Sequence, residues 1–289
     1  MFGYSDDNWV LAPSVSALQK MMNTIEEYCG SHSLKFSTDP NPLKCKTKCI
    51  AFLQKNRVIP NIVLNGNPLP WVTEGIHLGN YFSNKYDGMA RDIKLKKGQF
   101  ISKNYELMQE FSFAHPATKM QTILLYNCHF TGSPIWDLDN VEVKSLENSW
   151  NIAVRKVYDL PVRTHRYLVE PISDHEHLAK TLIRRFISFI SQIENSSKCV
   201  VKQLFNLVKS DARSITGGNI RKIKLLTGKS NLLDAKYALK DIPFAPVPKN
   251  EDWRISIIKE LSDVKFGQSV LPGFTDTEVN ELIHFSCTT

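Results

Sequence analysis

The sequence predicts an α+β protein, in which a short antiparallel sheet with one helix is followed by a mostly α-helical remainder. Three observations support this class. Strand-like apolar runs separated by turn residues are confined to about the first 85 residues. The dipeptide Asn65-Gly66 between apolar residues is a strong hairpin signal. From about Asp87 onward, the apolar residues recur at the helical period.

One helix and several short strands are predicted in the first 85 residues. Ser14 and Ser16 precede apolar positions at helical spacing, which predicts a helix over Ala17–Tyr28 that ends at Gly30. The apolar runs predict strands at Leu34–Phe36, Cys49–Leu53, Ile62–Leu64 and Ile76–Leu78, with the last two on either side of Asn65–Pro68.

Four helices are predicted after residue 86. The first is long, with apolar residues such as Ile93 and Phe100 on one face and lysines on the other. The second begins at Pro116 and ends before Gly132. The third passes through Leu146, Trp150, Val154 and Val157, and the fourth begins with a capping box of Ser173 and Glu176 and continues to Ile193.

Composition is that of an ordinary globular protein. The 289 residues are 42% hydrophobic and 22% charged. No apolar run approaches the roughly 20 residues that span a bilayer, so no membrane partner is expected. Six cysteines are too few for a disulfide scaffold, which indicates an intracellular location without distinguishing nucleus from cytoplasm.

Positive charge is concentrated in the first three quarters of the chain. The net charge is +7, yet residues 230–289 hold six basic and nine acidic residues, so residues 1–229 carry +10. This distribution favours a polyanionic partner, and a solvated basic surface is the alternative. The basic clusters are Lys94-Lys96-Lys97, Arg163-His165-Arg166, Lys180-Arg184-Arg185 and Arg221-Lys222-Lys224.

Tyr4-Ser5-Asp6-Asp7 is the candidate catalytic motif. Neighbouring carboxylates repel each other, so a folded protein seldom crowds them without a cation. Their oxygens select magnesium or manganese, and two such ions can clamp the attacking and leaving oxygens of phosphoryl transfer. Apolar residues on both sides predict two short strands joined by a tight turn. A surface turn that uses aspartate only for local hydrogen bonds is the alternative.

The order of these elements resembles the palm of a reverse transcriptase, of the kind encoded by non-LTR retrotransposons of the chicken-repeat and jockey type. The resemblance rests on the Asp6-Asp7 turn, the helix after it, Leu34–Phe36 and the basic loop Lys44–Phe52. In addition, Leu69–Val72 with His77–Gly79 resembles the hairpin that grips the primer end.

Later segments extend the resemblance over essentially the whole chain. Residues 86–135 resemble the thumb, and Ser149–Lys156, Leu160-Pro161 and Thr164–Tyr167 resemble the segment after it. Pro246–Pro248, Glu251–Arg254, Pro272–Phe274 and Cys287–Thr289 resemble the carboxyl end of such elements. The predicted domains are therefore 1–85, the C-terminal half of a partial polymerase palm, 86–135, thumb-like helices, and 136–289, a C-terminal helical region of unassigned role.

The resemblance implies roles for particular residues. Asp6 and Asp7 would be catalytic ligands of Mg²⁺ or Mn²⁺. The expected partners are an RNA template and a DNA primer. Tyr4, Lys46, Leu78 and Gly79 would bind the nucleotide or primer, and Lys94, Lys96, Lys97 and Lys103 would contact the nucleic-acid backbone.

Departures from the family pattern limit what this chain is expected to do alone. Asn8 and Trp9 replace the aliphatic residues usual after the turn. The family's other metal-binding aspartate and its fingers precede this turn and are absent from these 289 residues, so the missing portion is an expected partner. The resemblance thus implies a fragment of an RNA-directed DNA polymerase that is inactive alone. The alternatives are a stand-alone basic nucleic-acid-binding module and a non-functional remnant of a mobile element.

Other motifs are weaker candidates. His175 and His177 are two residues apart and share no helix face, so a zinc site is not expected. Cys128-His129 lacks an acidic orienting residue, and Gly217-Gly218 is predicted to be a turn between basic helices rather than a phosphate loop. The aromatic residues at helical spacing are expected in the core rather than stacked on bases: Trp136, Trp150, Phe186 and Phe189.

Overall fold

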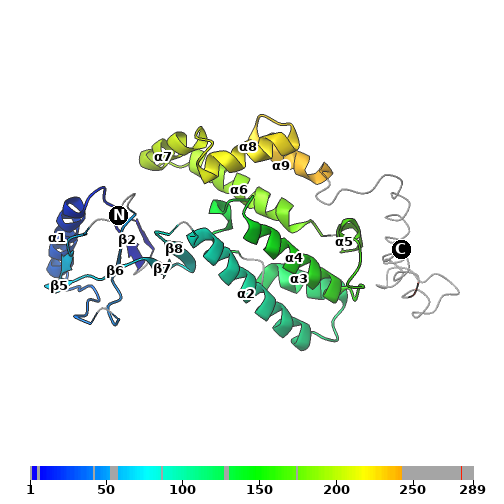
Figure 1. Ribbon diagram of the computed structural model, residues 1–289, viewed down its shortest axis with the longest axis horizontal. Helices are drawn as coiled ribbons and strands as arrows, with labels where there is room; N and C mark the ends of the chain where they lie inside the picture. Colours follow the sequence, from blue (N-terminus) through cyan, green and yellow to red (C-terminus); the bar gives the residue numbers. More distant parts are fainter. Residues whose placement is uncertain are drawn as a thin grey trace. The chain divides into compact units, whose positions relative to one another are not determined.

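The computed structural model describes residues 2–4, 7–41, 43–52, 58–85, 87–126, 130–173, 175–242 and residue 281. This part of the chain is a mixed α and β structure, largely helical with a few short sheets. Two compact units divide the chain, Met1–Asp92 and Ile93–Thr289 (Figure 1). All the strands that the structure describes belong to the first unit.

The β structure of the first unit consists of four two-stranded sheets among the described residues. The expectation of one antiparallel sheet is therefore wrong here, because the strand pairs are separate and one pair is parallel. The pairs are β1 (Phe2–Tyr4) with β2 (Asp7–Trp9), β3 (Cys49–Ile50) in parallel with β6 (Trp71–Val72), β4 (Val63–Leu64) with β5 (Asn67–Pro68), and β7 (Glu74–His77) with β8 (Asn80–Ser83).

Helix α1 (Val15–Ser31) is longer than predicted and includes Gly30. Ser14 caps it, since its hydroxyl accepts a hydrogen bond from the Ala17 amide at 3.2 Å. Its Gln19 amide donates to the Val63 carbonyl and accepts from the Val63 amide, both at 2.8 Å, so α1 is fixed to β4. The predicted strand Leu34–Phe36 is irregular chain instead.

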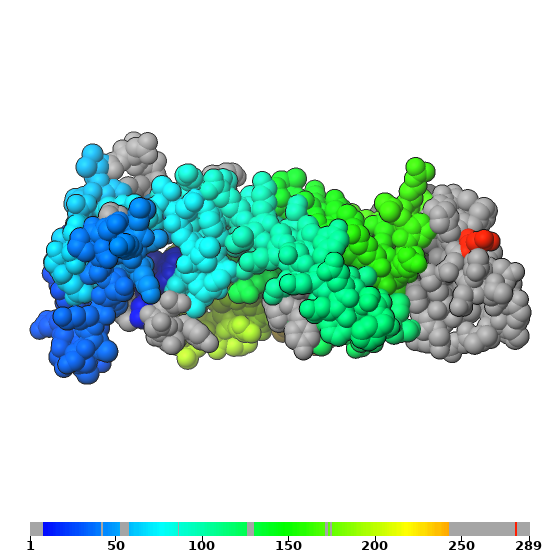
Figure 2. Space-filling model, turned by 90° about the horizontal axis from the view of Figure 1, so that it is seen from below, coloured from blue at the N-terminus to red at the C-terminus, as the bar shows by residue number. Residues whose placement is uncertain are grey.

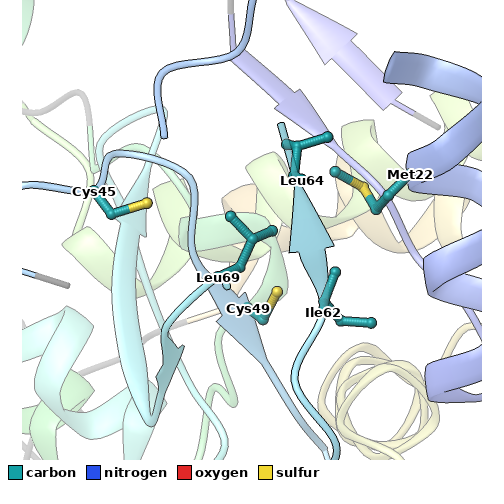
Figure 3. Close-up of a cluster of buried hydrophobic side chains, with 6 residues drawn as sticks. All are labelled: Met22, Cys45, Cys49, Ile62, Leu64 and Leu69. Atoms are coloured by element: carbon teal, nitrogen blue, oxygen red, sulfur yellow. The ribbon is translucent and has the colours of Figure 1, made fainter. Parts of the chain in front are cut away.

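Six buried side chains form the core of this unit: Met22, Cys45, Cys49, Ile62, Leu64 and Leu69 (Figure 3). Met22 comes from α1 and Leu64 from β4, so the core joins the helix to the strands. Burial, with a smaller contribution from Cys45, raises the pKa of the Cys49 thiol to about 11. The two cysteines are therefore part of the hydrophobic packing of this unit.

The Asn65-Gly66 turn forms as predicted, although its partner strand was predicted wrongly. Asn65 and Gly66 have φ angles of 50° and 73°, the left-handed values that a two-residue hairpin turn requires. The chain returns in β5, immediately after the turn, rather than in the more distant run Ile76–Leu78.

The second unit is helical in the residues described. It includes most of α2 (Gly88–Glu110), then α3 (Pro116–Tyr126), the 3₁₀ turn η1 (Ser133–Ile135), α4 (Val141–Val157), α5 (Arg166–Ser173), α6 (Leu178–Glu194), α7 (Cys199–Lys209), α8 (Ile215–Thr227), α9 (Leu232–Ala238) and η2 (Leu239–Asp241). The predictions of α2, α3, α4 and α6 are confirmed. Figure 2 shows turquoise residues of α2 on the surface.

Aromatic side chains fill the core of the second unit. Trp136, Trp150 and Phe186 are buried, as predicted. The Phe100 ring of α2 lies 5.9 Å from the Trp150 ring of α4, and 5.6 Å from the Phe130 ring. These contacts join α2 to α4 and to the segment before η1.

The predicted capping box of α6 is wrong. Ser173 is the last residue of α5, a short helix that the sequence analysis missed. The cap of α6 is His177, whose Nδ1 accepts a hydrogen bond from the Ala179 amide at 3.2 Å.

The predicted turn at Gly217 and Gly218 is also wrong, because both residues lie in the first turn of α8 rather than in a turn between helices.

Helix α8 packs closely against the end of α7 at Gly217. A Cβ atom on Gly217 would lie 2.2 Å from the Asp211 carbonyl oxygen and 2.9 Å from that of Val208. Gly217→Ala is therefore expected to lower the free energy of unfolding by about 1–2 kcal/mol, because the clash exceeds the gain in helix propensity.

Gly98→Ala in α2 is the matched control. A Cβ on Gly98 would have no neighbour within 4 Å, so this variant should gain about 0.5–1 kcal/mol. Urea denaturation of both variants measures the two changes. If both substitutions changed the free energy of unfolding in the same direction, the close packing at Gly217 would not explain the effect of Gly217→Ala.

Candidate functional site

The Asp6-Asp7 motif lies at a hairpin, as the sequence predicts. Tyr4 of β1 pairs with Asp7 of β2, and Phe2 pairs with Trp9. Ser5 and Asp6, which separate these strands in the sequence, lie outside the described residues. For Tyr4 and Asp7 the structure describes the backbone only. The two predicted strands around the motif are therefore confirmed.

Trp9 joins this hairpin to a second one, β7–β8. Its ring lies 5.1 Å from the His77 ring of β7 and 4.6 Å from the Phe82 ring of β8. β2, β7 and β8 accordingly lie together in Figure 1. Trp9 departs from the pattern expected after the turn, and in the structure it packs between the two hairpins.

The turn of the second hairpin is Leu78-Gly79, two of the predicted primer-binding residues. Both have left-handed backbone angles, with φ of 47° and 73°. Leucine rarely adopts this conformation, which costs free energy and persists only where the surrounding structure enforces it. Leu78 is also 45% exposed at the tip. The hairpin thus holds an apolar side chain in solvent on a strained backbone.

The predicted extent of this hairpin requires a correction. Leu69–Val72 was predicted to pair with His77–Gly79. Instead, Leu69 is buried in the core and Trp71 pairs with Cys49 of β3. The strand that pairs with β7 is β8, which follows the turn immediately.

A polar network fastens the β7–β8 hairpin to the first turn of α2. The Glu74 carboxylate accepts hydrogen bonds from the Tyr81 hydroxyl at 2.5 Å and from the Arg91 guanidinium at 2.7 Å. Arg91 also binds Asp87, and the Tyr81 amide donates to Asp92 at 3.0 Å. The hydrogen bond to Glu74 raises the pKa of Tyr81, because it favours the protonated phenol. The tip of the hairpin therefore projects from a fixed base.

Lys46 lies on an anchored loop. Cys45 and Cys49 are buried, whereas Lys46 and Lys48 are exposed, so the loop alternates between core and solvent. The Cys45 thiol donates to the Thr47 carbonyl at 3.0 Å, and the Thr47 amide donates to Ser37 at 3.4 Å. Lys46 is thus exposed to solvent on a fixed loop, and its contact with a nucleotide or primer stays a prediction.

The described residues do not themselves assemble a metal site: no group of three His, Cys, Asp or Glu side chains is close enough to hold an ion. Carboxylate oxygens are the donors that Mg²⁺ prefers, and metal binding by Asp6 and Asp7 stays a prediction.

The lysines of α2 do not share one polar face, contrary to prediction. Lys96 and Lys97 are half-buried, whereas Lys94 and Lys103 are exposed. The Lys97 ammonium donates to Ser145 of α4 at 2.8 Å, and that of Lys94 lies 3.4 Å from Glu142. Lys97 follows Ile93 by four residues and therefore faces α4 with it. Contact of these lysines with a nucleic-acid backbone stays a prediction.

Several cations that the sequence analysis assigned to basic clusters are paired inside the second unit. The Lys180 ammonium lies 2.7 Å from Glu170, and Arg166 lies 3.0 Å from both Glu147 and the Nε2 atom of His177. Burial raises the pKa of Glu147 even though Arg166 opposes the rise. These residues connect α4, α5 and α6, a role that no sequence pattern predicts.

Two other motifs have limited description. His175, Glu176 and His177 precede α6, where Glu176 forms a salt bridge with Arg184. Cys128-His129 and the segments between residues 246 and 289 that resemble the family's tail lie outside the described residues.

Comparison of the chain with protein-family models, with curated protein sequences and with solved structures finds no match. Among the helices described, none is both long and apolar enough to cross a membrane.

Proposed function

We propose that this chain is a fragment of a retrotransposon reverse transcriptase, which supplies the catalytic turn, the primer-gripping hairpin and the thumb to template-directed nucleotidyl transfer. The observation that best supports the proposal is the contact of Trp9 with His77 and Phe82. It places the hairpin bearing Asp7 beside the hairpin bearing Leu78 within one unit.

Each part of the first unit has a role in this proposal. Asp6 and Asp7 would hold Mg²⁺ or Mn²⁺, which supplies charge stabilisation for phosphoryl transfer when bound. Leu78 would contact the primer end from the strained turn, and Lys46 would attract phosphate from the anchored loop. Because catalysis depends on positioning the reacting groups, the chain would need a second carboxylate-bearing strand to be active.

Cross-linking from Leu78 tests the proposal. Leu78 is replaced by p-benzoyl-phenylalanine in the full chain, which is then irradiated with a DNA primer annealed to an RNA template. We expect the cross-link to map to the last few nucleotides at the 3′ end of the primer, because the hairpin tip would lie there.

Tyr28 is the matched control position, since it is an exposed aromatic residue of α1 in the same unit. The same replacement at Tyr28 should give little cross-linking. Equal yields from the two positions, or cross-links from Leu78 scattered along the duplex, would exclude the proposed primer contact.

A further inference from the structure

A basic groove of about 530 Å³ lies between the end of α7, helix α8 and the turn that follows α8. Arg221 and Lys224 of one basic cluster line it, whereas none of the predicted catalytic, primer-binding or backbone-binding residues does. Its lining residues are Lys209, Ser210, Ala212, Gly217, Ile220, Arg221, Lys224, Leu225, Gly228, Lys229 and Ser230.

Two glycines and a helix cap shape this groove. The absence of a side chain at Gly217 lets α8 approach the carbonyls of Val208 and Asp211. Ser214 caps α8, and its hydroxyl donates to the Val208 carbonyl at 2.6 Å. At the other end, Gly228 adopts a φ of 64° and terminates α8, so that Lys229 turns back toward the groove.

Four exposed cations line the groove: Lys209, Arg221, Lys224 and Lys229. Arg221 and Lys224 are three residues apart and share one face of α8. The lining includes no carboxylate. Two nearby carboxylates form salt bridges with other cations. Asp211 pairs with Arg213 at 3.2 Å, and Asp139 pairs with Lys222, which does not line the groove. The groove is therefore a concentrated positive charge with a concave wall, an arrangement that focuses the electrostatic field.

We propose that this groove binds the phosphodiester backbone of a single-stranded nucleic acid. Cations along a groove match the repeated charges of a strand, and aliphatic residues between them, such as Ile220 and the 78% exposed Leu225, can contact unpaired bases. In a duplex the base faces are stacked and unavailable to these side chains. Because the cations would contact phosphates rather than base edges, we expect binding to be indifferent to sequence.

A lipid surface fits this groove less well, because a flat bilayer meets a concave wall only at its rim. The inference goes beyond the proposed polymerase role. It depends on charges in α7, α8 and the following turn, whereas the primer contact depends on the first unit. The groove proposal and the primer contact can therefore be refuted independently of each other.

The test measures binding of the full chain to labelled single strands of RNA and DNA of one sequence, to the corresponding duplex, and to phosphatidylserine vesicles over a range of salt concentrations. For a single strand, each neutralised phosphate contributes about −0.7 to the slope of log K against log salt concentration. The double variant Arg221→Gln/Lys224→Gln should reduce the slope by about 1.4 and the affinity ~10-fold. Tight binding to either kind of single strand supports the proposal.

Lys198→Gln/Lys202→Gln is the matched control, because it removes two exposed lysines at the start of α7, the N-cap Lys198 and Lys202, that do not line the groove. It should leave the slope nearly unchanged, and the charge-conserving Arg221→Lys/Lys224→Arg should retain binding. Equal losses in the control and in the groove variant would overturn the proposal, as would a preference for the duplex or the vesicles. Thermal melting verifies that each variant is folded.

Discussion

Glu170→Ala is expected to lower the free energy of unfolding by about 3 kcal/mol, measured by urea denaturation. The Lys180 side chain is only 6% exposed, and its ammonium lies 2.7 Å from the Glu170 carboxylate. Removing that carboxylate deletes the ion pair that Glu170 forms with this buried cation. The cost is at the lower end of the range for buried pairs, because the Glu170 side chain is 31% exposed.

Lys180→Met is the control for this prediction. Methionine fills much of the same volume, and the remaining carboxylate can turn its charge toward water. We therefore expect a smaller loss than for Glu170→Ala. In the double variant, Lys180→Met should recover part of the loss caused by Glu170→Ala, because no buried ammonium remains. If Lys180→Met proved the more damaging single change, burial of the lysine charge would not be the dominant effect.

Stability should also fall as pH decreases from about 6.5 to 4, because His177 is held neutral. Burial, with a further contribution from Arg166, lowers the pKa of His177 from 6.5 to about 4. Between these values the unfolded chain binds a proton that the folded chain does not. The stabilisation is therefore complete above pH 6.5 and is lost as pH falls through 4, by about 3 kcal/mol in total.

His177→Asn isolates this effect. Asparagine can accept the hydrogen bond from the Ala179 amide, so the cap of α6 is retained while the titrating group is removed. Denaturation at pH 7 and pH 4.5 should show that the free energy of unfolding falls less for the variant than for the original chain. Glu147 acts in the opposite direction, since its raised pKa favours proton uptake by the folded state. It is present in both proteins, so the comparison retains the contribution of His177. Identical losses would refute the prediction.

The sequence predicts elements whose signal is local. Trp150 and Val154 repeat at helical spacing, and α4 buries both. Asn65-Gly66 meets the steric requirement of a two-residue turn without help from distant residues. The sequence does not predict helix α5, because eight residues give too short a periodic pattern, and Ser173 therefore resembles the cap of the next helix.

Long-range pairing was the part that the sequence could not predict. In the sequence Lys180 is one member of a basic cluster, and only the fold brings Glu170 of α5 to it. The sequence predicts that Lys97 is a surface lysine, whereas in the structure its ammonium donates a hydrogen bond to Ser145 of α4. The basic groove depends on the approach of α7 and α8 at Gly217, for which two adjacent glycines gave only an ambiguous signal.

The turn Leu78-Gly79 shows the same limit at the candidate site. Leucine is disfavoured at a left-handed position, so no turn preference predicts it there. The structure overrides that preference through the strand pairing of His77 with Asn80 and the network of Glu74, Tyr81 and Arg91. Only the resemblance to a primer grip predicted a role for these two residues, which stays a prediction, and the structure supplies their conformation.

The raised pKa of Cys49 makes this residue an internal reporter of core opening. With a pKa of about 11, roughly one molecule in ten thousand carries the reactive thiolate at pH 7. Alkylating reagents that attack thiolates therefore meet an inert sulfur while Cys49 is packed with Leu69 and Ile62. The thiol regains its ordinary acidity only when α1 and the strands separate, so its chemistry follows the opening of the first unit.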